Sequence, residues 1–472
     1  MKLFCLAIIA LATSIPGAFA AEMAMGFRVG EVNQRTAIIW TRITRDAERN
    51  WDGYREPSKR QKKVEAYQPS TVNVNDRQGA VPGAAGQVRV RLWPEAEPDA
   101  QQTTKWVSVN EETDYTHQFN LKDLQPGTQY QITVEARDSS DLPVSATVSG
   151  RFGTPQPESQ WQDVTFGVVT GQSYWDLDHR DGYHIYPAMK NQDLDFLVPT
   201  GDTVYLDSEA PRARTIPLAR YHWQRMYSLP RHIHFHREVP GYWEVDDHDS
   251  WVNDGWPSKS AAWMNPLSFE EGFGVYREQV PMGDSTFRTI RWGKGLQIWL
   301  VEGRLFRSAN TMPDGPGKTI WGTEQLDWLT RTILASDAEF RVLISPTPIV
   351  GPDRDKGKND NHANEAFAHE GNQFRMWTKQ QNLKNFFTCC GDRHWQYMSI
   401  DPGSGLTEFS CGPASDLHAG GNPEQPDWQP FLRVKGGFLT VAVRRQNGIP
   451  VIAFRHHDVH GKVVHEFTAR SR

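Results

Sequence analysis

The chain has 472 residues, a formal net charge of −6 and 38% hydrophobic residues, with 18 Trp and 22 Phe in its composition. This composition supports a large hydrophobic core and excludes an intrinsically disordered chain. The mild charge and the lack of a Lys/Arg run argue against a nucleic-acid partner, and the length predicts two or three domains.

The first 20 residues have the pattern of a secretory signal peptide. Lys2 provides the positive start, residues 3–15 are apolar, and Ala18-Phe-Ala20 has the small-x-small pattern of a cleavage site. The apolar run is too short to span a membrane, and no later run approaches the required length. We therefore predict that the mature chain begins near Ala21 and is exported, to the periplasm or the medium, without a membrane anchor.

Three cysteines remain after this cleavage: Cys389, Cys390 and Cys411. An odd number leaves at least one thiol unpaired in an oxidising compartment. Because adjacent cysteines bridge only with strain, we expect Cys411 to pair with Cys389 or Cys390.

Residues 21–153 have the patterns of an all-β region. Residues 35–43 are rich in β-branched side chains, and residues 87–93 alternate between polar and apolar. The Leu-x-Pro-Gly-Thr-x-Tyr turn at 124–130 resembles the tyrosine corner of immunoglobulin-like sandwiches. We expect an immunoglobulin-like β-sandwich here, followed by a polar, proline-bearing linker at 154–160.

Residues 161–472 alternate between predicted strands and helices. Strands are predicted at 164–170, 295–301 and 341–345, and helices at 182–192 and 323–336. Such alternation predicts a layered domain of α/β type.

The stretch 195–205 is central to this second part. A buried apolar run leads into Gly201-Asp202, and Tyr205 follows. An acid just beyond a buried strand lies at the carboxyl edge, where such sheets bind ligands. Carboxylate and phenolate oxygens suit a hard or trivalent metal ion, whereas the simpler alternative is a strand-end turn with a capping Asp. Gly391-Asp392 repeats the pattern, with His394 soon after it.

Three further segments add charged groups. Residues 243–254 contain five carboxylates, a His and an Asn, and Trp residues within the segment argue against a solvated acidic loop. So many acids repel one another unless a cation, usually a metal, offsets them. Arg304 follows a strand and suits an oxyanion, and Asp360-Asn-His-Ala-Asn364 offers alternating polar side chains, although ordinary loop polarity explains both equally well.

Other polar clusters are interpreted as surface features. Two histidine clusters are expected to be exposed rather than metal-binding: His232, His234 and His236, which alternate as on one face of a strand, and His456, His457 and His460. Asp176-x-Asp178-x-x-Asp181 lacks the Gly and Glu of a calcium loop and is expected to cap the next helix.

Taken in order, these motifs resemble the PhoD-like alkaline phosphatases over nearly the whole mature chain. The motifs are Gly201-Asp-Thr-Val-Tyr205, Asp246-Asp-His-Asp249 with Asn253, Glu302-Gly-Arg304, Ser345-Pro-Thr-Pro348 and Gly391-Asp-Arg-His394. The resemblance implies an α+β chain of two domains, an immunoglobulin-like β-sandwich and a four-layer α/β/β/α metallophosphoesterase domain. It also implies an exported phosphomonoesterase or phosphodiesterase that uses iron with calcium.

The resemblance assigns roles to residues. Asp202 is expected to bridge two metals and Tyr205 to bind iron, with further metal ligands at Asp247, Asp360, Asp392 and His394. His248 and Arg304 are the expected catalytic residues, and Asn253 and His362 are expected to contact the substrate.

One motif departs from the family pattern. The first strand of the family commonly ends in Ser-Cys-x, with the Cys bound to metal, whereas this chain has Thr170-Gly-Gln172. Gly171 cannot coordinate a metal, so Gln172 or water is expected to fill the place. A site without the thiolate favours calcium, magnesium or manganese over iron.

The sequence therefore predicts a secreted, metal-dependent hydrolase of small-molecule or polymer-linked phosphate esters. One alternative is a hydrolase of sulfate esters that uses the same site. The other is a surface protein that binds metal or carbohydrate without catalysis. Oligomeric state and the preference for monoesters or diesters stay open.

Overall fold

The computed structural model describes residues 20–56, 71–353, 360–421 and 423–471. The predicted signal peptide lies almost entirely outside these ranges, so its prediction stays as it is. Within the described ranges, no helix combines the length and the apolar character that crossing a bilayer requires.

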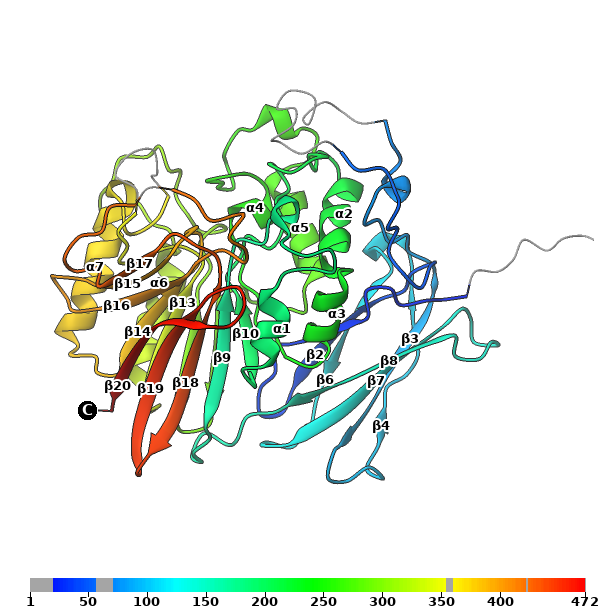
Figure 1. Ribbon diagram of the computed structural model, residues 1–472, viewed down its shortest axis with the longest axis horizontal. Helices are drawn as coiled ribbons and strands as arrows, with labels where there is room; N and C mark the ends of the chain where they lie inside the picture. Colours follow the sequence, from blue (N-terminus) through cyan, green and yellow to red (C-terminus); the bar gives the residue numbers. More distant parts are fainter. Residues whose placement is uncertain (1–19, 57–70, 354–359, 422, 472) are drawn as a thin grey trace, which may run out of the picture.

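The N-terminal strands form two antiparallel sheets (Figure 1). The first contains β1 (Phe27–Gly30), β2 (Ala37–Arg42) and β6 (Thr116–Leu121). The second contains β3 (Gly86–Pro94), β4 (Gln102–Thr103), β5 (Val107–Val109), β7 (Gln129–Arg137) and β8 (Ala146–Gly153). Side chains of both sheets share one hydrophobic core. At the predicted corner, the Tyr130 hydroxyl accepts a hydrogen bond of 2.7 Å from the backbone N of Gln125.

Two larger sheets follow. One has the order β10-β9-β18-β19-β20 and the other β11-β12-β13-β14-β16-β15-β17. The first contains β9 (Val164–Val169), β10 (Phe196–Pro199), β18 (Phe438–Gln446), β19 (Ile449–His457) and β20 (Val463–Arg470). The second contains β11 (Arg288–Trp292), β12 (Leu296–Leu300), β13 (Phe340–Ser345), β14 (Phe386–Cys390), β15 (Gln396–Ile400), β16 (Thr407–Cys411) and β17 (Phe431–Arg433). One hydrophobic core joins the facing sides of the two sheets.

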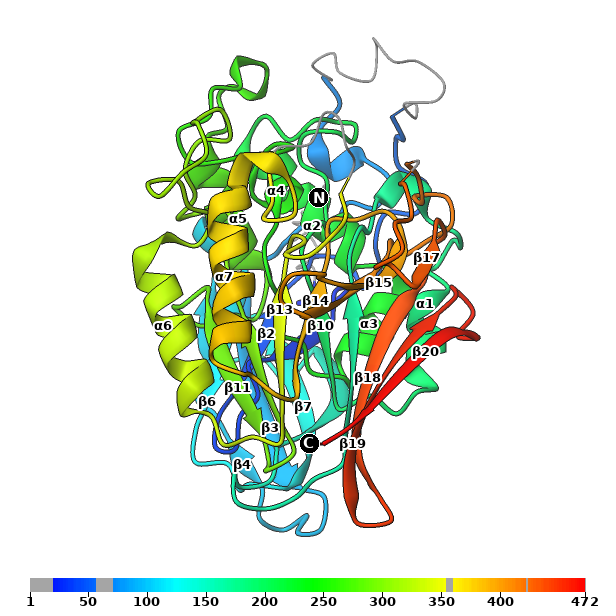
Figure 2. The same ribbon diagram turned by 90° about the vertical axis from the view of Figure 1, so that its left-hand side faces the viewer.

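Helices cover the outer face of each of these sheets. Figure 2 shows α6 (Gly322–Ala335) and α7 (Ala368–Gln380) over the seven-stranded sheet, where Leu329 and Phe374 pack against strand residues such as Leu343. The other helices are α1 (Ile185–Lys190), α2 (Ile216–Tyr227), α3 (Pro230–His236), α4 (Asp247–Ser250) and α5 (Phe269–Gln279). The molecule is thus a mixed α+β protein in which helices enclose two packed sheets.

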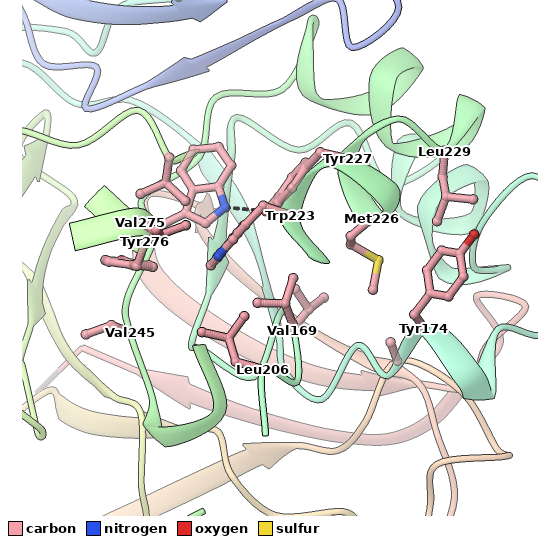
Figure 3. Close-up of a cluster of buried hydrophobic side chains, with 14 of the residues drawn as sticks. Val169, Tyr174, Leu206, Trp223, Met226, Tyr227, Leu229, Val245, Val275 and Tyr276 are labelled. Carbon is pink, nitrogen blue, oxygen red and sulfur yellow. Dashed lines mark hydrogen bonds between the residues drawn. The ribbon is translucent and has the colours of Figure 1, made fainter. Parts of the chain in front are cut away.

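The core on the helical side of β9 and β10 also supports the loops at the ends of these strands. Figure 3 shows Val169, the last residue of β9, grouped with Leu206 and Val245 near Trp223 of α2. Leu206 follows the strand-end acid Asp202, and Val245 immediately precedes the acidic segment. The same hydrophobic cluster therefore holds both acidic loops in place.

The expected disulfide is wrong. Within the described ranges, Cys389, Cys390 and Cys411 are buried free thiols. The parallel pairing of β14 with β16 places Cys389 opposite Phe409 and Cys390 opposite Ser410, so neither thiol faces Cys411 across the ladder. Burial raises the pKa of all three thiols, which keeps them protonated and unreactive.

The expectation of exposed histidines is also wrong for four of the six residues. The first cluster lies on a helix, α3, which begins at Pro230, and its members four residues apart face the core. His232 and His236 are buried there, and only His234 is exposed. The second cluster includes two buried residues of β19, His456 and His457, and one exposed residue, His460.

His456 should make the fold sensitive to acid. Its ring nitrogens lie 3.1 Å from the carbonyl oxygen of Ser410 and 3.1 Å from Nδ1 of His465, and burial lowers the pKa of His456 to about 3. The unfolded state, with a pKa of about 6.5, binds the proton more readily. The contribution of His456 is therefore fully present above about pH 6.5 and is lost as the pH falls toward 3, by about 1.4 kcal/mol per pH unit.

Urea unfolding at pH values between 7 and 4 checks this. The free energy of unfolding should fall less steeply for His456→Phe than for wild type, because the new ring carries no proton and packs against Phe409 and Phe431. The control, His460→Phe, changes an exposed residue and should keep the wild-type slope. Equal slopes for all three proteins would contradict the assignment.

Candidate metal centre

The predicted site residues converge at the carboxyl ends of the parallel strands. β9 and β10 run parallel, as do β12, β13, β14 and β16, so the loops that follow them share one edge. In Figure 1, α4 lies at this edge, at the end of β10. This arrangement brings the Gly201, Gly391 and 243–254 motifs together, as the sequence predicts.

The glycine before Asp202 permits this convergence. Gly201 has φ +92°, and a Cβ at this position would overlap Asp246. Asp202 and Asp392 also adopt positive φ, +53° and +58°, which few L residues do. Gly201-Asp202 and Gly391-Asp392 therefore form tight turns, which allow the acidic segments to lie close together.

Among the described residues, three groups of side chains place their potential ligand atoms within 4.8 Å of one another. They are Asp202 with Asp247 and His248; Asp202 with Asp246 and Asp392; and Asp247 with Asp254 and Asp360. Asp202 and Asp247 each belong to two groups, as residues between two ions would. Asp246 and Asp254 extend the predicted ligand set, and both come from the acidic segment that the sequence analysis singled out.

The chemistry of this cluster fits a cation. Within the described part of the chain, no hydrogen-bond donor reaches Asp202 Oδ1 or Asp246 Oδ2, although both atoms are buried. Burial raises the pKa of Asp202 well above its usual range, and burial raises that of Asp246 to about 7 even though Arg304 opposes it. Buried carboxylates with unused oxygens are the partners that a metal ion requires.

Arg304 lies among the carboxylates and is completely buried. Its Nε lies 2.6 Å from Asp246 Oδ1, and its Nη2 lies 3.8 Å from Asp247 Oδ2 and 3.7 Å from Asp360 Oδ2. Burial alone would lower the pKa of this guanidinium, but the carboxylates outweigh that effect and raise it. In the structure, Arg304 is a counter-charge to the acids, and its predicted contact with a substrate stays a prediction.

His248 has a carboxylate partner of its own. Its Nδ1 lies 2.6 Å from Asp207 Oδ1, and the second oxygen of Asp207 accepts a hydrogen bond of 2.9 Å from the backbone N of Asn253. Burial opposes the charged imidazole, but Asp207, Asp247 and Asp202 together raise the pKa of His248 well above its usual range. Asp207 is a residue that the sequence analysis missed, since no motif marks it.

His248 also lines an open pocket of about 590 Å³ beside the carboxylates. The predicted residues Tyr205, Asn253 and His394 line this pocket as well, together with His418. Arg55, from the N-terminal part of the chain, lines it too. The pocket offers space for a ligand beside the acids.

Tyr205 stands between the acids and this pocket. Its hydroxyl lies 3.5 Å from Asp202 Oδ2 and 2.7 Å from Nε2 of His418. The His418 ring also packs against that of His394, with their centroids 4.2 Å apart. His418 lies in a loop without a recognisable motif, so nothing in the sequence marks it as a site residue.

His362 is placed elsewhere. Its Nε2 lies 2.8 Å from Glu370 Oε2 of α7, and its ring packs 4.3 Å from that of Trp321. It is not among the residues that line the pocket. These contacts connect the 360–364 loop to the helical layer, while Asp360 of the same loop faces the carboxylates.

The end of β9 has a glycine, Gly171, at the position where the resemblance predicts a cysteine ligand. Gly171 has φ +61°, and the side-chain carbonyl of Gln172 accepts a hydrogen bond of 2.6 Å from the Tyr186 hydroxyl. The same oxygen lies 3.2 Å from Nε2 of His232, so it is already used on the helical side. The side-chain oxygen of Gln172 is therefore engaged away from the acids, and the alternative that water fills the place stays a prediction.

Gly171→Cys should not raise the iron content of the protein. The new Cβ would lie 3.2 Å from Pro413 Cβ and 3.3 Å from His418 Cδ2, and the left-handed backbone costs a non-glycine residue about 1–2 kcal/mol. We expect lower thermal stability and no gain of iron per chain. Gly171→Ala, the control, carries the same backbone strain without the thiol. A gain of iron in the Cys variant alone would contradict this prediction.

Comparisons with known proteins agree with this geometry. A sequence model of the family described as PhoD-like phosphatase matches residues 166–470. The solved structure of PhoD has a TM-score of 0.73 at 15% identity, covering 96% of this chain and 91% of that chain. Purple acid phosphatase PPD1 from yellow lupin (Lupinus luteus) seeds has a TM-score of 0.59 at 12% identity, covering 94% of this chain and 73% of that chain. No curated protein sequence matches the chain. At these identities the two structures show a shared fold alone.

Proposed function

Because the chain belongs to the PhoD-like phosphatase family, a family of metal-dependent phosphoesterases, we propose that it hydrolyses phosphate monoesters and diesters outside the cytoplasm. One observation carries the proposal. A buried group of carboxylates, with unused oxygens on Asp202 and Asp246, borders the pocket that His248 lines. The acids would hold the metals, and the pocket would hold the organic part of the ester.

Metals bound at these acids would polarise the phosphoryl oxygen and activate a water molecule for attack. The group around Tyr205 and Asp202 suits iron, because a phenolate and a carboxylate are hard ligands for a trivalent ion. The group of Asp247, Asp254 and Asp360 offers oxygen alone, which suits calcium.

We assign the proton transfer to His248. Asp207 holds Nδ1 and so determines the orientation of the ring, which leaves Nε2 as the nitrogen that can meet a substrate in the pocket. From Nε2 the imidazolium would give its proton to the leaving oxygen of the ester. This assignment uses the same Asp–His arrangement that fixes the tautomer in other acid–base catalysts.

Elemental analysis combined with three substrates tests the function. We expect turnover of nitrophenyl phosphate and bis-nitrophenyl phosphate, loss of turnover after chelation, and recovery after metal is returned. Preferential turnover of nitrophenyl sulfate would support a sulfatase instead. A protein that binds metal but turns over none of the three substrates would be a binding protein, and the proposal would be wrong.

Two further proposals concern the N-terminal part. The sequence pattern at residues 1–20 supports export, and N-terminal sequencing of exported protein that begins at Met1 would contradict it. The shared core of the first two sheets and the Tyr130 corner support an immunoglobulin-like sandwich over residues 21–153. The remaining domain would then span residues 161–472.

A further inference from the structure

His418 lies in the loop between β16 and β17, outside the predicted motifs and 213 residues from Tyr205, yet it reaches the metal centre. Its Nε2 lies 2.7 Å from the hydroxyl of Tyr205. We propose that His418 is a metal ligand, which binds through Nε2 the same ion as Tyr205 and Asp202. The inference rests on the proposed metal centre and adds to it a nitrogen donor from a loop outside the predicted motifs.

The orientation of the ring supports this role. Nδ1 of His418 lies 2.8 Å from Asp176 Oδ2, so the neutral ring carries its proton on Nδ1 and donates it to the carboxylate. The lone pair is then on Nε2, directed at the Tyr205 hydroxyl. Metal-binding histidines almost always donate their other ring N–H to a carboxylate, a backbone carbonyl or water. Here the hydrogen bond from Tyr205 occupies the lone pair that a metal would use.

The loop that carries His418 is attached to the end of β9. Thr170 and Pro413 form a parallel bridge, and the backbone N of Ala414 donates to the Gly171 carbonyl over 3.3 Å. The Ser415 hydroxyl donates to the Asp176 carbonyl over 2.6 Å. These contacts hold His418 and its partner Asp176 in one fixed unit, which is what a ligand of defined geometry needs.

Gly171 provides the space that the imidazole occupies. A Cβ at this position would lie 3.3 Å from Cδ2 of His418, so any side chain there would meet the ring. Position 171 thus offers no side-chain ligand, and the 412–418 loop places an imidazole beside it. The ring of His418 therefore explains why residue 171 is a glycine, and the glycine explains how the ring fits there.

The atoms around Nε2 of His418 include oxygens that can bind a metal ion. The Tyr205 hydroxyl lies 2.7 Å from Nε2 and 3.5 Å from Asp202 Oδ2, so two oxygens and one nitrogen converge at a place lined by described residues. A set of one imidazole, one phenol and one carboxylate suits iron or zinc better than calcium. His418 should therefore affect the binding of Zn²⁺ much more than that of Ca²⁺.

A double-mutant cycle separates this role from a purely supportive one. If His418 only orients Tyr205, then His418→Phe should change nothing once Tyr205 is replaced by Phe. If His418 binds the ion itself, the His418→Phe substitution should lower Zn²⁺ affinity whether residue 205 is Tyr or Phe. The titrations use the metal-free full chain with Zn²⁺ and, separately, Ca²⁺. His460→Phe, at an exposed histidine, is the matched control.

We expect His418→Phe to weaken Zn²⁺ binding by about 100-fold and Asp176→Asn by about 10–100-fold, with little change for Ca²⁺. X-ray absorption at the zinc edge should count one imidazole ligand fewer in His418→Phe than in wild type. Asp176→Asn keeps the metal-site residues in place, so it tests the inference even if His418→Phe folds poorly. An unchanged imidazole count, or no effect of His418→Phe in the Tyr205→Phe background, would overturn the inference.

These measurements do not depend on turnover. A wild-type protein that binds Zn²⁺ through His418 yet hydrolyses no ester would refute the proposed function and support the ligand. If the wild type hydrolyses phosphate esters but His418→Phe keeps the same number of imidazole ligands, the proposed function is supported and the role of His418 as a ligand is refuted.

Discussion

Replacing Asp202 with asparagine should lower the turnover of nitrophenyl phosphate by about 1000-fold or more and reduce the metal content in the same variant. Asp202 belongs to two of the three ligand groups and has a buried Oδ1 that no described donor reaches. A neutral amide cannot offset the charge of two cations, so both effects have the same cause. Steady-state kinetics and elemental analysis of the same preparation measure them together.

Asp195→Asn is the matched control. Asp195 precedes the same strand, β10, at its opposite end, and it is also largely buried, with its pKa raised to about 6 by that burial. It accepts a hydrogen bond of 2.8 Å from the backbone N of Thr165 and is remote from the ligand groups. We expect wild-type metal content and rate. If Asp202→Asn behaved in the same way, Asp202 would be a strand-end turn residue and the centre would lie elsewhere.

The acids of this centre were predictable because local patterns mark them. An apolar run followed by Gly-Asp indicates a buried strand that ends at a sheet edge, and this holds for both Asp202 and Asp392. The acidic segment 243–254 likewise carries its signal in its own composition. What such patterns cannot determine is the use of each acid: Asp249 accepts from the backbone N of Thr203 and of Val204 and supports the turn.

Residues brought in by tertiary contacts could not be found this way. His418 is 213 positions from Tyr205 in sequence, and nothing near it distinguishes it from other loop residues. The prediction that the histidines of α3 are exposed was wrong for another reason. Over seven residues, alternation fits a strand and a four-residue spacing fits a helix, so His232 and His236 satisfied both patterns. Pro230 at the start of the segment was the signal that favoured a helix.

Arg304→Met should destabilise the metal-free protein by about 3–5 kcal/mol, the usual cost of breaking a buried ion pair from one side. The guanidinium is completely buried, and its loss leaves Asp246 without its cation. Without the guanidinium, which lowers the pKa of Asp246, the folded-state pKa of this buried carboxyl rises further above the unfolded value, and the group takes up a proton. The cost should therefore increase as the pH rises, because the folded state must either hold that proton or bury the charge.

Arg307→Met is the control for this prediction. Arg307 is also buried, but it donates to the backbone carbonyl of Asp360 rather than to a carboxylate, and burial lowers its pKa to about 10. Its loss should cost less, about 1.5–3 kcal/mol, as for a hydrogen bond to a charged donor. Adding Asp246→Asn to Arg304→Met should recover part of the stability, because the uncompensated charge is then removed. Saturating metal should recover part of the stability as well, since a bound cation replaces the missing guanidinium charge.

Urea unfolding of the metal-free and metal-loaded proteins measures each of these differences. If Arg304→Met cost no more than Arg307→Met, the acids would not depend on Arg304 as their counter-charge, and a direct role at the substrate would become the better assignment.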